Sequence, residues 1–427
     1  MTTKPDRTKA PATEPFRPCH LPEIEHMRHA GGATLHIFSG GSEAVSVLTL
    51  VFGGGASESS SALRELYPTM LAEGTSSLSS ADIADRMDFY GARPAFRMTD
   101  HFTTLQIWML NRNADPILGL LADILADASF PDDKLARTKL IAKSRLAIGR
   151  EKVSVRAAES ATAMIAGADH PSAHVLTDAE IDAVTSADLA DLHSRIRGAG
   201  NCHAYLGGLL DSDVTMAVRH LLDSLPCCNG EMPLNIKPFN AEPPRTVHIS
   251  MPRSVQAGLC VALPAIPRCH PDYLPLRIAV MALGGYFGSR LMSNLREKEG
   301  ITYGISSYLN GSLDGSAVYI AAQCASDKVD LAVEQIAAEM INLADKPPVS
   351  DEMERLRLNL STTALAAIDT PAGVIGQYVT ERTVGLPEGY FDRQQELVSN
   401  LTPEIIADAA RRYLRPELMR TAIASAE

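Results

Sequence analysis

The sequence predicts an α+β protein built from two similar halves, each with a mixed or antiparallel sheet packed against helices. Strand-like segments alternate with longer segments of helical spacing, and hairpin-like turns argue against a doubly wound parallel sheet. The same order of elements then returns after a proline-rich stretch. We therefore infer an internal repeat of roughly 200 residues, for which gene duplication is the simplest origin.

Length and composition describe a globular protein. The chain has 427 residues, of which 45% are hydrophobic, and a formal net charge of -12. An acidic chain with 5% aromatic residues lacks the clustered Lys and Arg and the stacking rings that nucleic-acid binding needs. The sequence shows no export signal and no apolar run of the roughly 20 residues that cross a membrane. We therefore expect a cytoplasmic protein without nucleic-acid or membrane partners.

The first domain is placed at residues 30–222, after an N-terminal tail at 1–29. Residues 39–42 (SGGS), between two β-rich runs, predict a hairpin. Runs rich in β-branched and aromatic residues predict strands at 33–38, 44–52, 92–98, 102–110 and 202–206. Apolar residues at helical spacing predict helices at 81–90, 116–128, 132–148 and, in one or two pieces, 178–197.

A linker is predicted at residues 223–245, which contain five prolines and little periodicity. The second domain follows at 246–427. It is expected to hold strands at 246–251, 259–263, 302–309 and 316–323, with a helical stretch at 273–296. The repeat extends to detail, because ASFPDDKLARTKLIAKSRLA in the first half and KPPVSDEMERLRLNLSTTALA in the second both place a proline and acidic residues before a long helix.

The most distinctive segment is LGGYFGSRL at residues 283–291, followed by LREKEGITYG at 295–304. A phosphate-binding P-loop would need Gly followed by Lys and Ser or Thr at a helix start. A dinucleotide-binding fingerprint would need its glycines directly after a strand. These glycines lie inside or beside a predicted helix, so the segment fits neither kind of site.

This segment instead resembles the C-terminal half of the pitrilysin/insulinase-type zinc peptidases, also called inverzincins. The run LxLVFGGGASE, the pair Gly74-Thr75 and residues 83–91 resemble the N-terminal half of that family, so the resemblance covers nearly the whole chain from about residue 30. It implies a fold of two homologous halves. It also implies that Arg296 and Tyr303 stand where the family has an Arg and a Tyr that bind the substrate peptide's backbone near the scissile bond.

Arg296 and Tyr303 are chemically suited to hold a peptide. A guanidinium offers a rigid fork of donors, and a phenol adds one donor and a flat face. The structural alternative is that Arg296 pairs with a carboxylate at a helix end and that Tyr303 is a half-buried strand residue. The residue types alone favour this alternative, and the surrounding motif reverses the preference.

The family's catalytic motif, H-x-x-E-H, does not occur in this chain. In the family its two His residues lie on one face of a helix and bind zinc, and the Glu acts as general base. Aligned on Gly74-Thr75, the five positions hold Glu65, Leu66, Tyr67, Pro68 and Thr69. Pro68 thus replaces the base and Thr69 the second His. Because proline removes a helix hydrogen bond, we expect the helix to start or kink at Pro68.

The family's third zinc ligand, a Glu on a later helix, should fall within residues 134–150. That stretch holds six basic residues and no carboxylate, and the equivalent position is placed near Lys143. A cation cannot coordinate Zn²⁺ and repels it. We therefore expect neither a metal site nor a catalytic residue in this chain. The basic stretch itself has a simpler interpretation as a solvated helix face.

Together these features predict the non-catalytic subunit of a heterodimeric zinc metallopeptidase, inactive alone. A homologous H-x-x-E-H subunit would supply the zinc, and Arg296 and Tyr303 would position the peptide substrate in that partner's active site. The alternative is a degenerate homologue that acts as a structural, assembly or peptide-binding protein without hydrolysis. An autonomous hydrolase finds no ligand set or nucleophile in the sequence to support it. A homodimer of the isolated chain is left open.

Overall fold

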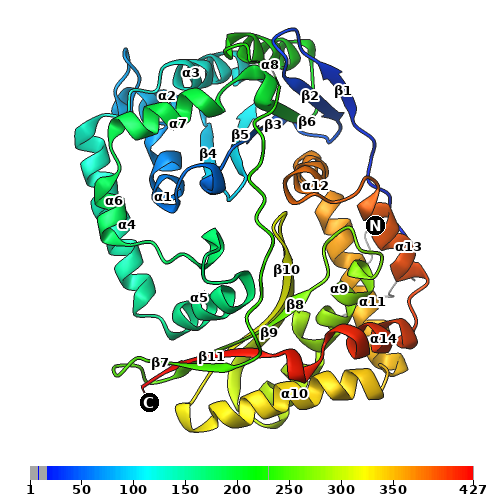
Figure 1. Ribbon diagram of the computed structural model, residues 1–427. Coiled ribbons are helices and arrows are strands. Elements are labelled where there is room, and N and C mark those ends of the chain that lie inside the picture. Colours follow the sequence, from blue (N-terminus) through cyan, green and yellow to red (C-terminus); the bar gives the residue numbers. More distant parts are fainter. Residues whose placement is uncertain (1–7, 9–16, 229, 427) are drawn as a thin grey trace.

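The computed structural model describes residue 8, residues 17–228 and residues 230–426. Two mixed β-sheets lie in the two halves of the chain, and helices cover both (Figure 1). The first sheet has the strand order β1-β2-β6-β3-β5-β4, and the second has the order β7-β11-β8-β10-β9. The predicted α+β class with two halves of similar design is confirmed. Of the predicted tail, residues 1–7 and 9–16 lie outside the described residues.

The elements have the following bounds. The strands of the first sheet are β1 (Glu25–Arg28), β2 (Thr34–Ser39), β3 (Val45–Gly53), β4 (Arg93–Met98), β5 (Phe102–Leu110) and β6 (Cys202–Gly208). The helices of the first half are α1 (Ser61–Met70), α2 (Ser80–Tyr90), α3 (Ala114–Asp127), α4 (Asp132–Arg150), α5 (Val153–Ala166), α6 (Asp178–Ala183), α7 (Ser186–Ile196) and α8 (Ser212–Ser224). The second sheet contains β7 (Thr246–Ser250), β8 (Ala257–Ala265), β9 (Thr302–Gly311), β10 (Ser316–Cys324) and β11 (Arg420–Ser425). The helices of the second half are α9 (Tyr273–Val280), α10 (Val329–Asp345), α11 (Ser350–Ile368), α12 (Pro371–Val384), α13 (Tyr390–Ser399) and α14 (Pro403–Tyr413).

The internal repeat is visible in the strand topology. In the first sheet β2 and β6 are parallel, and in the second β7 and β11 are parallel. Every other pair of neighbouring strands in the two sheets is antiparallel. The two helices that the sequence pairs with each other, α4 and α11, each have 19 residues and two acidic residues in the first turn. Acidic residues there complement the positive end of the helix dipole, so both halves start this helix in the same way.

The predicted hairpin at residues 39–42 is wrong. Strand β6 lies between β2 and β3, and its Ala204 pairs with Leu35 on one side and Leu50 on the other. The turn residues do connect the two strands, but β3 is buried over almost its whole length and belongs in the middle of the sheet. A strand from a distant part of the chain supplies its second neighbour, which a local turn signal cannot show. The sequence prediction also missed β1, which pairs with β2.

One helix of each half packs against the sheet of the other half. Helix α5 packs on the second sheet, where Val153, Ala157 and Ala161 form a buried cluster with residues of β8, β10 and β11. A Cβ on Gly258 of β8 would lie 2.5 Å from the carbonyl group of Val153, so only glycine allows this approach. In turn, Ile375 of α12 packs on the first sheet with residues of β3, β5 and β6. The two halves therefore share two buried surfaces besides the chain connection.

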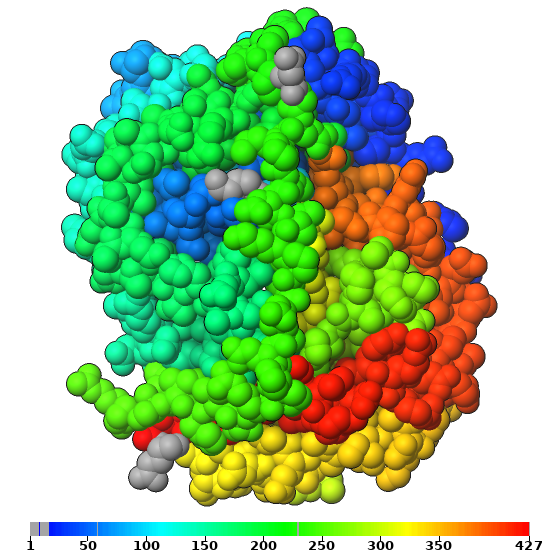
Figure 2. Space-filling model, in the orientation of Figure 1, coloured from blue at the N-terminus to red at the C-terminus, as the bar shows by residue number. Residues whose placement is uncertain are grey.

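The proline-rich stretch crosses the molecule between the halves. From residue 230 to residue 245 it contains no helix or strand, and it lies on the face seen in Figure 2. Its backbone N–H groups are nevertheless used, since Asn240 donates to the carbonyl of Ala166 and Met232 donates to the side chain of Asn201. The stretch is thus attached to the first half along its course. Among the described residues no helix is both long and apolar enough to cross a bilayer.

Candidate functional site

The positions of the missing zinc motif lie on α1, facing α4. The carboxylate of Glu65 accepts a hydrogen bond from Nη1 of Arg145 at 2.7 Å, so an ion pair occupies the place between the two helices. Thr69, one turn further along α1, is exposed. A carboxylate already neutralised by a guanidinium is a poor metal ligand, and the cation opposes a second positive charge. In the parts of the chain that the structure describes, no group of three or more His, Cys, Asp or Glu side chains could hold a metal. The residues present therefore do not fit Zn²⁺.

Two details of this region differ from the prediction. Lys143 does not lie opposite Glu65, because its Nζ pairs with Asp182 on α6 at 2.7 and 2.9 Å. Arg145, two residues further along α4, lies opposite Glu65 instead. Residues two apart in a helix point to nearly opposite faces, so Lys143 and Arg145 cannot both face α1. The sequence places the residue opposite Glu65 within the basic stretch of α4. It does not determine which residue of that stretch faces α1. Helix α1 also does not start at Pro68, since it begins at Ser61 and continues to Met70.

Tyr67, inside the former motif, is part of a buried hydrogen-bonded pair. Nε2 of His193 donates to the carbonyl of Leu125 at 2.9 Å, so Nδ1 carries no hydrogen and accepts one from the Tyr67 hydroxyl at 2.9 Å. Burial, with a smaller contribution from the charge of Arg197, lowers the pKa of His193 from 6.5 to about 4. The imidazole is therefore neutral in the folded protein at neutral pH. Its two hydrogen bonds connect Tyr67 and the carbonyl of Leu125 inside the core.

This neutral histidine predicts a pH-dependent stability. As the pH falls below 6.5 the unfolded chain takes up a proton that folded His193 refuses until about pH 4, so the free energy of unfolding decreases over this range. We expect the contribution of His193 to shrink by up to about 3 kcal/mol between pH 7 and pH 4. Urea unfolding of the wild type and of His193→Gln should show a difference that narrows with falling pH. His220→Gln, at an exposed histidine of α8, is the control, and a constant His193 difference would contradict the prediction.

Arg296 and Tyr303 lie at the ends of two neighbouring elements of the second half. The predicted continuous helix at 273–296 is interrupted: α9 passes into a π-helical segment, η5 (Met281–Gly285), and a turn then precedes a second one, η6 (Met292–Lys298), which carries Arg296. A Cβ on Gly284 would lie 2.8 Å from Oγ of Ser307, so the glycine lets η5 approach β9 closely. π-Helical turns are rare and often accompany functional sites.

Tyr303 is placed on β9, an edge strand of the second sheet, at an irregularity in the pairing. Thr302 pairs with Cys324 and Ile305 pairs with Ala322, so two residues of β9 face a single residue of β10. Such a β-bulge turns side chains out of the regular alternation. Tyr303 and the next residue, Gly304, are both exposed, and the Tyr303 side chain is 88% exposed.

The guanidinium of Arg296 lies against two exposed aromatic rings. Its Cζ is 5.0 Å from the ring centroid of Tyr303 and 5.1 Å from that of Phe287, both within cation–π distance. No carboxylate pairs with it among the described residues, whereas Arg290 in the same segment is held by Glu352 at 3.0 and 3.1 Å. The structural alternative, an ion-paired Arg296 beside a half-buried Tyr303, is therefore wrong on both points.

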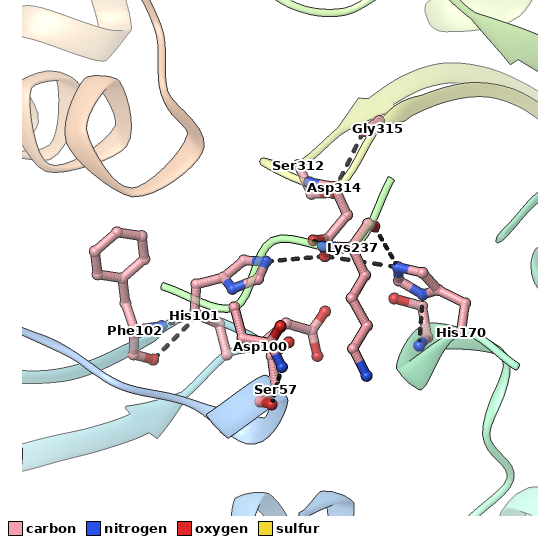
Figure 3. Close-up of polar contacts among 12 residues, drawn as sticks. Ser57, Asp100, His101, Phe102, His170, Lys237, Ser312, Asp314 and Gly315 are labelled. Atoms are coloured by element: carbon pink, nitrogen blue, oxygen red, sulfur yellow. Dashed lines mark hydrogen bonds and ion pairs between the residues drawn. The ribbon is translucent and has the colours of Figure 1, made fainter. Parts of the chain in front are cut away.

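A second polar cluster, which the sequence did not indicate, joins the two halves (Figure 3). Asp314, in the β9–β10 turn, accepts from Nε2 of His101 at 2.9 Å and from the backbone N–H of Lys237 at 2.8 Å. His170 lies on the other side, with Nε2 3.9 Å from the carboxylate and 2.8 Å from the carbonyl of Lys237, to which it donates. The side chains of His101, His170 and Asp314 are 4%, 4% and 2% exposed.

The charge of Asp314 is stabilised inside this cluster. Burial by itself would raise the pKa of the carboxyl group, but the hydrogen bonds from His101 and from the N–H of Lys237 outweigh it and hold the pKa below its usual range. The cluster has no open side for a substrate, because its three side chains are almost fully buried. Its members come from the first half, the linker and the second half, so the cluster holds these three parts of the chain together. Sequence reasoning missed it because these residues are far apart along the chain.

Comparison with known proteins gives consistent results. Residues 183–360 match the family model described as the peptidase M16 inactive domain. An uncharacterized zinc protease of Rickettsia felis is 22% identical over 306 residues, which cover 70% of this chain and 72% of that protein. The crystal structure of a peptidase M16 inactive domain from Pseudomonas fluorescens has a TM-score of 0.83 at 24% identity and covers 94% of this chain and 98% of that one. The structure of a protease from Helicobacter pylori also has a TM-score of 0.83, at 15% identity, with 95% and 100% covered.

These matches agree with the α+β fold of two similar halves. The resemblance seen in the sequence is confirmed. The chain is similar to the M16 inactive domain over residues 183–360, has the fold of M16-like peptidases, and lacks the H-x-x-E-H motif.

Proposed function

We propose that this chain is the non-catalytic subunit of a heterodimeric zinc peptidase and that it binds the peptide substrate through Arg296 and Tyr303. The observation that carries the proposal is the partly exposed Arg296, whose guanidinium lies within cation–π distance of two exposed aromatic rings and has no carboxylate partner in the described part of the chain. Stacking uses the two faces of a guanidinium and leaves the N–H groups at its edge free. Those groups can donate to the carbonyl groups of an extended peptide, and the Tyr303 hydroxyl can add one more donor.

The metal and the general base would belong to the partner. In this chain the corresponding place holds the Glu65–Arg145 ion pair, which does not fit Zn²⁺. A homologous H-x-x-E-H subunit with the peptide added along one of its sheet edges would bring the scissile bond to its own zinc site, and this chain would fix the peptide's position. We place the complex in the cytoplasm, as the sequence suggests.

The test is substitution of Arg296 in the assembled complex. Co-expression with an H-x-x-E-H chain encoded by a neighbouring gene gives the complex, and Arg296→Ala is expected to lower kcat/KM about 10- to 100-fold, because charge-assisted hydrogen bonds contribute about 1.5 to 3 kcal/mol. Tyr303→Phe, which removes one hydroxyl, should cost less. Zinc content should stay at the wild-type level in both complexes.

The control for this test is Arg415→Ala, which removes an exposed arginine that is paired with Glu417. Full activity in both the Arg296 and the Tyr303 variants would refute the proposed role. It would favour the alternative, a homologue with a structural, assembly or peptide-binding role and no hydrolysis. The absence of any H-x-x-E-H partner gene would favour the same alternative.

A further inference from the structure

Phe287, in the segment LGGYFGSRL, lies beside Arg296. It lies in the turn between η5 and η6, where the N–H of Ser289 donates to the carbonyl of Tyr286 at 3.1 Å. The Phe287 side chain is 64% exposed, so the ring is not there to fill the core. The Arg296 guanidinium lies 5.1 Å from its ring centroid.

The Phe287 ring can restrict the Arg296 side chain, which is otherwise flexible. Arg296 is carried by a long, flexible stem, and no carboxylate among the described residues fixes its head. An arginine that must first be ordered loses conformational entropy when it binds, which weakens the complex. Phe287 and Tyr303 both lie within cation–π distance of the guanidinium and restrict its position, and a cation–π contact leaves its N–H donors for an acceptor.

We propose that Phe287 is a positioning residue, which orders the Arg296 guanidinium for the peptide's carbonyl groups. The inference rests on the proposed function for its effect on hydrolysis, but the ordering itself is a property of the isolated chain. Phe287 acts through Arg296 and does not need to touch the substrate. Tryptophan at this position should serve as well, because it is the strongest cation–π partner, whereas alanine should not.

The ordering can be measured without a partner or a substrate. In protein labelled with ¹⁵N-arginine, the side-chain Nε–H resonance of Arg296, identified by its absence in Arg296→Lys, should be displaced by the two aromatic rings. Phe287→Ala should move this resonance toward the position of exposed arginines, and Phe287→Trp should keep it displaced. Phe89→Ala, which removes an 81% exposed ring from α2, is the matched control. An unchanged Arg296 resonance in Phe287→Ala would overturn the inference.

A double-mutant cycle in the complex separates positioning from a merely structural role. Phe287→Ala is expected to lower kcat/KM about two- to fivefold, the effect of an exposed cation–π contact, and Phe287→Trp should restore it. In an Arg296→Ala background the same substitution should have no further effect, because the group that it orders is gone. An equal loss in both backgrounds would overturn the inference. If Arg296→Ala itself leaves activity unchanged, the proposed function fails, and the resonance of Arg296 still decides whether Phe287 orders it.

Discussion

Replacing Asp314 with alanine is expected to lower the free energy of unfolding by about 3 to 5 kcal/mol, because two buried donors lose a charged acceptor. The carboxylate is 2% exposed and accepts hydrogen bonds from His101 and from the N–H of Lys237. Without it, the Nε2–H of His101 and the backbone N–H of Lys237 lose the carboxylate as an acceptor inside a buried site. The cost is therefore much larger than for an ion pair at the surface.

Urea unfolding at pH 7 measures this effect. Asp182→Ala is the matched control, because Asp182 is also an aspartate in an ion pair, with Lys143, but is 55% exposed; its loss should cost less than about 1 kcal/mol. Asp314→Asn keeps the volume and one acceptor and should fall between the two. Since Asp314 connects both halves through His101 and the linker, the unfolding transition of Asp314→Ala should also broaden or split as the halves lose their coupling. A cost similar to that of Asp182→Ala would show that the cluster does not stabilise the fold.

Much of each half could be predicted from the sequence because it depends on local patterns. Strand β3 is a continuous apolar run, and α2 ends at Gly91, which has a φ of 70° that favours glycine. The relation of α4 to α11 also follows from a pattern that occurs twice. The order of strands in the first sheet could not be predicted, because Ala204 reaches its place between Leu35 and Leu50 from far along the chain.

Helices α5 and α12, which pack on the sheet of the other half, also could not be placed from local patterns. Ala157 on α5 and Ile375 on α12 are apolar residues at helical spacing, which predicts a buried face but not the sheet on which it is buried. The only local hint is a strand glycine, Gly258, and its reason becomes visible only once Val153 lies on it. Helical periodicity predicts that one face of a helix is buried. The chain topology determines which sheet that face packs against.

For the candidate site, the sequence identified the chemistry better than the geometry. Arg296 and Tyr303 were found through a motif, and the structure places them next to each other. Phe287 stands in the LGGYFGSRL segment, but its contact with Arg296 could not be predicted, because an aromatic residue in a turn has no characteristic spacing to an arginine in the following helix. The loss of zinc ligands was read from the absence of H-x-x-E-H, but the partner of Glu65 required the structure, because it depends on the rotation of α4.

Restoring the missing ligands should restore zinc binding. Residues 65 and 69 lie four apart on α1 and therefore on one face, and the 2.7 Å contact between Glu65 and Arg145 shows that side chains at positions 65 and 145 reach a common point. The triple variant with Glu65→His, Thr69→His and Arg145→Glu presents two imidazoles and a carboxylate, a ligand set found in catalytic zinc sites. We expect it to bind one Zn²⁺ with a Kd of about 1 μM or lower.

The decisive comparison is with the double variant that keeps Arg145. It has both histidines, but a guanidinium stands in the place of the third ligand, so its affinity for Zn²⁺ should be at least about 100-fold weaker than that of the triple variant. Both affinities can be measured by competition with a chromophoric chelator, with far-UV circular dichroism to show that each variant is folded. Equal affinities would mean that the carboxylate does not reach the metal and that the α1–α4 contact is not the site of the lost zinc. A large difference would show that the charge at position 145, and not only the missing histidines, opposes zinc binding between α1 and α4.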